Sequence, residues 1–156
     1  MTESYSKIGA RFDTPTTTAD FKLGECVEGS DGTKWTYVQA SGAIAQYDAV
    51  AIDENFQAAA LTKALADAGQ TVGVAQAAFT DDYYGWVALK GTNISVNVLA
   101  SCAADAQLYT TGTAGKLDDA STSQTAIDGI VIVTAASGAT QAEECIISTG
   151  LFGAQR

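Results

Sequence analysis

The chain has 156 residues, a length that suits one domain with a buried core and no need of disulfide staples. Hydrophobic residues make up 47% of it, which excludes a disordered chain, and because many of them are alanine we expect small core side chains. Eighteen acidic residues against eight basic ones give a net charge of −10, which would repel a phosphate backbone and argues against nucleic-acid binding.

The residue types that are missing limit the chemistry. There is no histidine, the most common general base and metal ligand. The three cysteines, Cys26, Cys102 and Cys145, are far apart and form no CxxC pair, so no zinc site is indicated, and the latter two are expected to pack as small buried hydrophobes. No glycine motif for phosphate binding occurs, and the acidic pairs lack the spacing of a calcium loop. We therefore predict no enzyme activity, no cofactor and no metal.

Residues 1–20 differ from the rest of the chain. They contain five threonines, the only proline and three scattered apolar anchors, Tyr5, Ile8 and Phe12. Such a segment cannot fold alone, so it is either a frayed tail or an extended arm whose anchors lie on a neighbouring subunit. It also lacks the apolar core of a signal peptide, and no apolar run in the chain reaches membrane-spanning length. We expect synthesis in a reducing cytoplasm without membrane association.

Residues 21–156 are predicted to form a single β domain. Trp35, Tyr37 and Gln39 alternate with the residues between them, the pattern of a half-buried strand. A helix of at most two turns is expected after Leu61, with Gly69 just beyond its C-terminus. Short strands with glycine-rich turns favour an all-β barrel or sandwich. The expected strands are 34–40, 47–52, 57–61, 72–75, 86–89, 94–98, 107–110, 116–117, 127–134 and 144–148.

A weak internal repeat runs through this domain. Val38 and Val96 are 58 positions apart, as are Val50 and Leu108. The Gly73–Gly129 spacing of 56 and the Val87–Ile146 spacing of 59 continue the pattern. A barrel made of two similar halves would produce this period, because each half supplies edges that the other pairs. The alternative is that evenly spaced strands match by coincidence.

The stretch between residues 79 and 86 is rich in aromatic residues. Phe79 and Trp86 are expected in the core. Tyr83 and Tyr84 follow Asp81-Asp82 in a polar loop and are harder to place inside. Tyrosine buries a large area with few rotatable bonds, so these two residues are candidates for contact with a protein or a sugar.

Several short segments resemble one known family. They are GAIAQYDAVAI at 42–52, VGVA at 72–75, VALKG at 87–91, the stretch 94–115 ending in QLYTTGTAG, GIVIV at 129–133, and 144–148. Their order over residues 35–150 resembles the small head decoration, or cement, proteins of tailed bacteriophages that have a β-tulip or related barrel. Tyr47 departs from the pattern, because that family commonly has glycine before Asp48.

The resemblance implies a structural protein with a β-tulip-like barrel of two similar halves, an extended N-terminal arm and at most one short helix. It would sit on the outer surface of the virion, bind the major capsid protein, and associate as a homo-oligomer, with a trimer favoured. The candidate contact residues are then Tyr5, Ile8, Phe12, Tyr83 and Tyr84. A receptor- or carbohydrate-binding module of a phage tail or fibre is the alternative. A small barrel enzyme such as a nucleotide hydrolase is the weakest hypothesis, because histidine and a phosphate-binding loop are missing.

Overall fold

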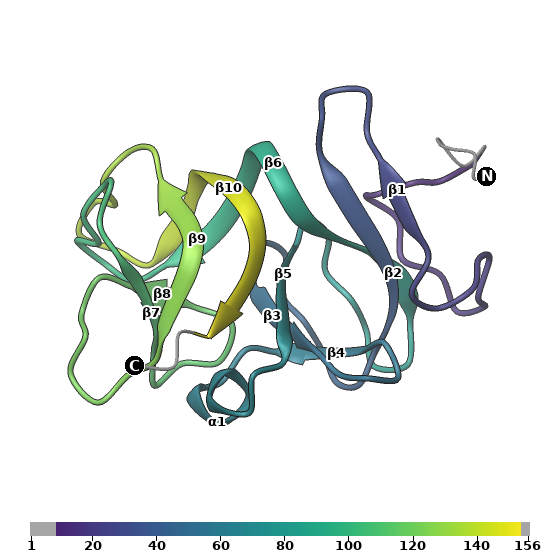
Figure 1. The fold of residues 1–156 in the computed structure, drawn as a ribbon, viewed down its shortest axis with the longest axis horizontal. Coiled ribbons are helices and arrows are strands. Elements are labelled where there is room, and N and C mark those ends of the chain that lie inside the picture. Colours follow the sequence, from purple (N-terminus) through teal and green to yellow (C-terminus); the bar gives the residue numbers. More distant parts are fainter. Residues whose placement is uncertain (1–8, 154–156) are drawn as a thin grey trace.

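A computed structural model describes residues 9–153, and for 149–153 it describes the backbone alone. The fold is mostly β, with one short helix (Figure 1). The elements are β1 (Cys26–Glu28), β2 (Lys34–Ala40), β3 (Ala49–Ile52), β4 (Gln57–Ala60), α1 (Lys63–Asp67), β5 (Thr71–Ala75), β6 (Tyr84–Val98), β7 (Leu108–Thr110), β8 (Leu117–Asp118), β9 (Ala126–Ile132) and β10 (Gln141–Gly153).

Five of the strands close a mixed barrel in the order β2-β4-β3-β5-β6. The pairing of β2 with β4 is parallel, with Gln39 opposite Gln57, and the other four pairings are antiparallel. The barrel closes where β6 returns to β2 and places Trp86 opposite Tyr37. A closed ring leaves no edge strand exposed. The expectation of a β-barrel is therefore confirmed.

The remaining strands extend this barrel. β1 pairs with the first three residues of β2, where Val27 is opposite Trp35. β10 pairs with the distal part of β6 and with β9, while β7 joins β9 to β8. β8 runs parallel to the end of β6, with Leu117 opposite Val98. Figure 1 shows β7, β8 and β9 gathered on one side of the molecule and β1 and β2 on the other, with β6 between them.

β6 corrects one expectation from the sequence. The segments 86–89 and 94–98 were predicted as two strands, but they belong to one strand of 15 residues. It bends at Gly91, whose φ is +134°, and at Asn93, whose φ is +57°. A Cβ atom at Gly91 would lie 2.5 Å from Thr33 Cγ2, so glycine is needed for this close approach. The glycine marks a bend rather than the end of a strand.

The barrel interior is filled by small side chains. All five barrel strands contribute to one buried cluster, which is closed by Ile44 and Phe79. Alanine and valine dominate because a five-stranded ring leaves little room between its walls. A larger cluster fills the space enclosed by β6–β10 and covers the outer faces of β3 and β5. The members of the barrel cluster are Val38, Ala40, Ile44, Val50, Ile52, Ala58, Ala75, Phe79 and Val87.

The single short helix agrees with the prediction. Thr62 caps α1 through its Oγ1, which accepts a hydrogen bond from the Leu65 amide at 3.4 Å. Gly69 follows the helix with a φ of +74° and donates its amide to the Ala66 carbonyl at 3.0 Å. Within residues 9–153, no helix has the length and apolar character needed to cross a membrane.

Candidate interaction site beneath the N-terminal arm

The described part of the N-terminal arm, residues 9–20, lies on the chain's own barrel. Thr16 and Tyr84 form an antiparallel bridge in which each amide donates to the other carbonyl at 2.8 Å. Residue 85, between this bridge and Trp86, is a glycine because the Phe79 ring leaves no room for a side chain, whereas the contact with the arm at Pro15 would tolerate one. A Cβ atom at Gly85 would lie 2.8 Å from the Phe79 ring and 3.5 Å from Pro15 Cα. The arm is thus held across the start of β6.

Phe12 anchors this segment. Its ring stacks on Trp35, with centroids 4.3 Å apart and planes 4° from parallel, and it meets Trp86 edge-on at 6.0 Å. The side chain is half-buried against the core. The sequence predicted that Phe12 is an interaction anchor, and the structure places its ring on β2 and β6 of the same chain.

The surface under the arm is an aromatic cluster of Phe12, Phe21, Trp35, Tyr37, Tyr84 and Trp86. Trp35 and Tyr37 share a face of β2 because they occupy alternate positions. Trp86 is opposite Tyr37 in the neighbouring strand, and the two rings lie 5.0 Å apart. Cross-strand aromatic pairs of this kind stabilise a sheet, and Tyr37 and Trp86 are both buried.

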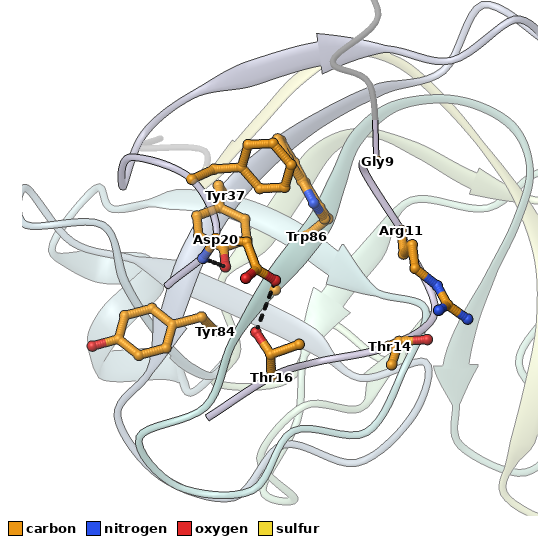
Figure 2. Close-up of a pocket in the computed structure, with 10 residues that line it drawn as sticks. Gly9, Arg11, Thr14, Thr16, Asp20, Tyr37, Tyr84 and Trp86 are labelled. Carbon is orange, nitrogen blue, oxygen red and sulfur yellow. Dashed lines mark hydrogen bonds between the residues drawn. The ribbon is translucent and has the colours of Figure 1, made fainter. Parts of the chain in front are cut away.

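A pocket of about 200 Å³ opens between the arm and this cluster (Figure 2). Tyr37, Tyr84 and Trp86 form its aromatic part, and Arg11, Thr16 and Asp20 line it from the arm. The Asp20 amide donates to Tyr37 Oη at 3.0 Å, and Thr16 Oγ1 donates to Asp20 Oδ2 at 3.4 Å. Aromatic faces beside one cation and one carboxylate suit a small polar ligand with an apolar face, or a side chain of a partner protein.

The two tyrosines predicted as contact residues differ in position. Tyr84 begins β6 and lines the pocket, whereas Tyr83 ends the preceding turn and is not among the lining residues. The Tyr83 amide donates to Thr80 O at 3.1 Å, and its carbonyl accepts from the Ala40 amide at 2.8 Å. Both tyrosine side chains are half-buried. Tyr5 and Ile8, the other predicted contacts, lie outside the described residues. Phe79 and Trp86 are buried, as predicted.

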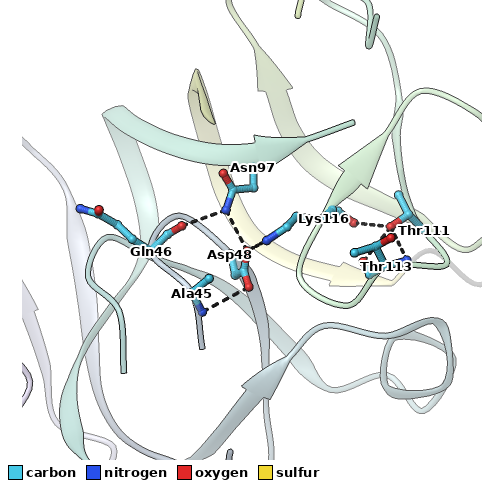
Figure 3. A network of polar contacts seen from close by, with 7 residues as sticks. All are labelled: Ala45, Gln46, Asp48, Asn97, Thr111, Thr113 and Lys116. Carbon is cyan, nitrogen blue, oxygen red and sulfur yellow. Dashed lines mark hydrogen bonds and ion pairs between the residues drawn. The ribbon is translucent and has the colours of Figure 1, made fainter. Parts of the chain in front are cut away.

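A second polar feature joins β3 to the turn before β8 (Figure 3). The Asp48 carboxylate is buried and forms an ion pair with Lys116. Asn97 Nδ2 donates to Asp48 Oδ1 and to the Gln46 carbonyl, both at 2.8 Å. A Cβ atom at Gly115 would lie 2.5 Å from Asp48 Cγ, so only glycine fits beside this carboxylate. The network fixes a structural joint and contains no nucleophile activated by a base.

One group of possible metal ligands occurs among the described residues. The ligand atoms of Cys102, Asp118 and Asp119 lie within 4.8 Å of one another. Burial, and then the charges of Asp119 and Asp118, raise the pKa of the Cys102 thiol to about 11. Burial likewise raises the pKa of Asp118. No sequence spacing indicated this group, because β8 brings residues 118–119 beside Cys102 only in the fold.

Most of the pocket was not predictable from the sequence. Trp35 and Tyr37 were assigned to a strand, and their alternation did indicate a shared face. Arg11 and Asp20 carried no signal, because their position depends on the path of the arm across that face. No protein-family model matches the chain, and a search of curated proteins finds no significant match.

Proposed function

We propose that the protein is a structural component of a phage virion that decorates the outer surface of the capsid and cements neighbouring copies of the major capsid protein. The observation that carries the proposal is a repeated strand pattern, in the segment order that resembles decoration proteins. In this proposal the domain is β-tulip-like and consists of two similar halves. The first half is residues 34–90, the second half is residues 91–148, and β6 contributes to both.

Strand pairing supports the two-half organisation. The first-half ring β2-β4-β3-β5-β6 has a counterpart in the second half, with β6, β8, β7, β9 and β10 in the same order. Both rings contain one parallel pair and four antiparallel pairs. Thr36 is opposite Val87, and the residues 58 positions later, Ile94 and Cys145, are also opposite each other. In this register Cys145, rather than Ile146, is the counterpart of Val87.

The connections between strands repeat as well. The Tyr47 amide donates to the Ala75 carbonyl, as the Asp105 amide does to the Ile132 carbonyl, and Tyr47 and Asp105 both have positive φ. Evenly spaced strands could match by coincidence. Coincidence would not also repeat rare backbone conformations and their hydrogen bonds at the same spacing. A further match involves Asp53 and Thr111, which are 58 positions apart. The side chain of each accepts a hydrogen bond from the backbone amide two residues later in the chain.

The charge and the chemistry are consistent with a structural role. A net charge of −10 suits a subunit outside the shell and away from the genome. In the pocket the Thr16 hydroxyl lies 3.4 Å from the Asp20 carboxylate, but the described residues that line it include no histidine or lysine to act as a general base. Copies that associate, with a trimer favoured, would engage several capsid sites at once, so modest contacts would add up to firm attachment. The arm, the aromatic cluster and Tyr83 are the proposed contact surfaces.

Binding to empty expanded capsids of the cognate virus tests this function. We expect the purified protein to bind and to raise the melting temperature of the shell, as followed by calorimetry. Deletion of residues 1–20 should leave the domain folded, because the barrel closes without them, while capsid affinity falls sharply. Thr18→Ala is the matched control, since that exposed side chain does not line the pocket. Failure of the intact protein to bind any such shell would refute the proposal.

The pocket favours one alternative function, a receptor- or carbohydrate-binding module of a tail or fibre. Sugars stack on aromatic rings and hydrogen-bond to charged side chains, and Tyr84, Asp20 and Arg11 supply both. A host-cell or glycan-array signal lost in Tyr84→Ala but kept in Tyr83→Ala would favour this alternative, because only Tyr84 lines the pocket.

A further inference from the structure

The second half carries an open groove of about 330 Å³ on the outside of β9 and β10. Its floor includes Val131 and Ile146, and one end is formed by the segment from Asp105 to Gln107. Ile146 is 39% exposed and lies opposite Val131, so the groove has an apolar surface open to solvent.

The corresponding surface of the first half is covered. The residues 58 positions before Asp105, Ala106 and Gln107 are Tyr47, Asp48 and Ala49, and the amide bonds of Tyr47 and Asp105 support this correspondence. The Asn97 amide donates to the Tyr47 carbonyl at 2.8 Å, the Ala49 amide donates to the Gly115 carbonyl at 2.9 Å, and Lys116 pairs with Asp48. Val74 and Ala88, the counterparts of Val131 and Ile146, are fully buried. The second half of the chain therefore covers this surface of the first half. The equivalent surface of the second half stays open as the groove.

One element that covers the first half is the turn 111–116, in which Gly115 donates its amide to the Leu61 carbonyl and accepts from the Ala49 amide. Its counterpart is the turn between β3 and β4, where Phe56 holds the position of Gly115. Both residues have positive φ, +59° for Phe56 and +79° for Gly115. A phenylalanine in that conformation is strained. Because Phe56 is also 40% exposed, burial within this chain offsets only part of the strain. Burial of its ring in a partner would offset part of that cost.

The sizes of the facing residues complement each other. Within the chain, Gly115 lies against Asp48, and even a methyl group would clash there. In the groove the counterpart of Asp48 is Ala106, which leaves more space, and the counterpart of Gly115 is Phe56, which needs more space. Within the chain the turn carries the small residue and the surface carries the large one. In the groove the turn would carry the large residue, Phe56, and the surface carries the small one, Ala106.

We propose that the groove receives the Phe56 turn of a second copy of this chain, in a head-to-tail contact that continues the surface joining the two halves. This inference rests on the self-association included in the proposed function. A head-to-tail contact uses different patches on the two partners, so it closes a ring or extends a filament. Asp53 and Glu54 on the turn would approach Asp105, so association depends on apolar burial and strengthens as salt screens the repulsion.

Sedimentation velocity of the full chain without capsids tests the contact. We expect the natural protein to form oligomers over a concentration series, and Phe56→Asp and Ile146→Asp each to weaken association by about tenfold or more. Val133→Asp is the matched control: Val133 is 44% exposed but does not line the groove, so its replacement should change nothing. Circular dichroism confirms folding, and Ile146→Asp serves if Phe56→Asp unfolds, because Phe56 also touches Gly24.

Mixing the two variants gives the sharper result. An intact Phe56 turn on one variant can enter the intact groove of the other, so an equimolar mixture should form dimers and stop there. Variants that sediment like the natural protein, a natural protein that stays monomeric, or a mixture that remains monomeric would each overturn the contact. Capsid binding is measured separately, so a failure here is distinguishable from a failure of the proposed function.

Discussion

Cys145 is a fully buried thiol on β10, opposite Ile94. Burial, with a smaller contribution from the charge of Glu144, raises the pKa of this thiol from 9.0 to about 12. Exposure on unfolding returns the pKa to its ordinary value, so the unfolded chain releases this proton at lower pH than the folded chain.

The stability of the fold should consequently depend on pH through Cys145. The contribution is complete below pH 9 and is lost as the pH rises toward 12. Its slope is about 1.4 kcal/mol of unfolding free energy per pH unit. Urea unfolding across this range should show a shallower decline for Cys145→Ala than for the natural chain. Parallel declines would contradict the assignment.

Single residues were predictable from the sequence only where their surroundings are local. Cys102 and Cys145 were expected to pack as buried hydrophobes because apolar neighbours flank them, and both are buried. Asp48 was not recognised as part of a network, because its partners Asn97 and Lys116 lie about 50 and 70 positions away in the chain. Pairing at that separation is decided by the fold and leaves no local pattern.

At the level of elements, the turn 111–116 is attached to β3 by the ion pair between Lys116 and Asp48. The Asp48 side chain is 6% exposed and that of Lys116 is 18% exposed, so neither charge is well hydrated. Removal of the cation would leave a buried carboxylate without its counter-charge.

Lys116→Met should therefore lower the unfolding free energy by about 3 kcal/mol, as measured by urea denaturation. Adding Asp48→Asn should restore part of the loss, since the amide is neutral and its oxygen can still accept from Asn97, although its NH2 group cannot accept from the Ala45 amide. The control is Lys63→Met: its pair with Asp67 is 45% and 48% exposed, so the change should stay within about 1 kcal/mol. Equal effects of the two lysine substitutions would contradict the account.

Strand positions were largely predictable, and their connections were not. Period-two alternation located 34–40 closely, the short apolar run at 72–75 located β5, and Gly69 marked the end of α1. Gly91 was interpreted as a strand boundary, since glycine both ends and bends strands. Only the contact of Gly91 with Thr33 decides between these roles, and that contact depends on tertiary structure.

For the whole molecule, sharing of β6 couples the two ends of the chain. Its first part closes the barrel with β2, and its second part pairs with β8 and β10. Neither group of strands keeps all of its pairings when the other is lost, so unfolding should be cooperative.

Two probes can test this coupling. The fluorescence of Trp35 and Trp86, the two tryptophans of the chain, reports on the barrel, and pulse labelling of the Cys145 thiol reports on the strands beyond it. We expect the two denaturation curves to share one midpoint. Separate midpoints would show that the two regions unfold independently.

The continuity of β6 also has a mechanical consequence. If neighbouring copies pull on opposite ends of the molecule, as the proposed decoration of a capsid under internal pressure implies, the tension passes along a single strand of 15 residues. Its hydrogen bonds to β2 and β10 run across the strand, so a pull along the strand strains many of them together rather than one after another. A chain with this arrangement transmits force between its two ends through one continuous strand. We expect strand pairing to be lost first at the bend at Gly91.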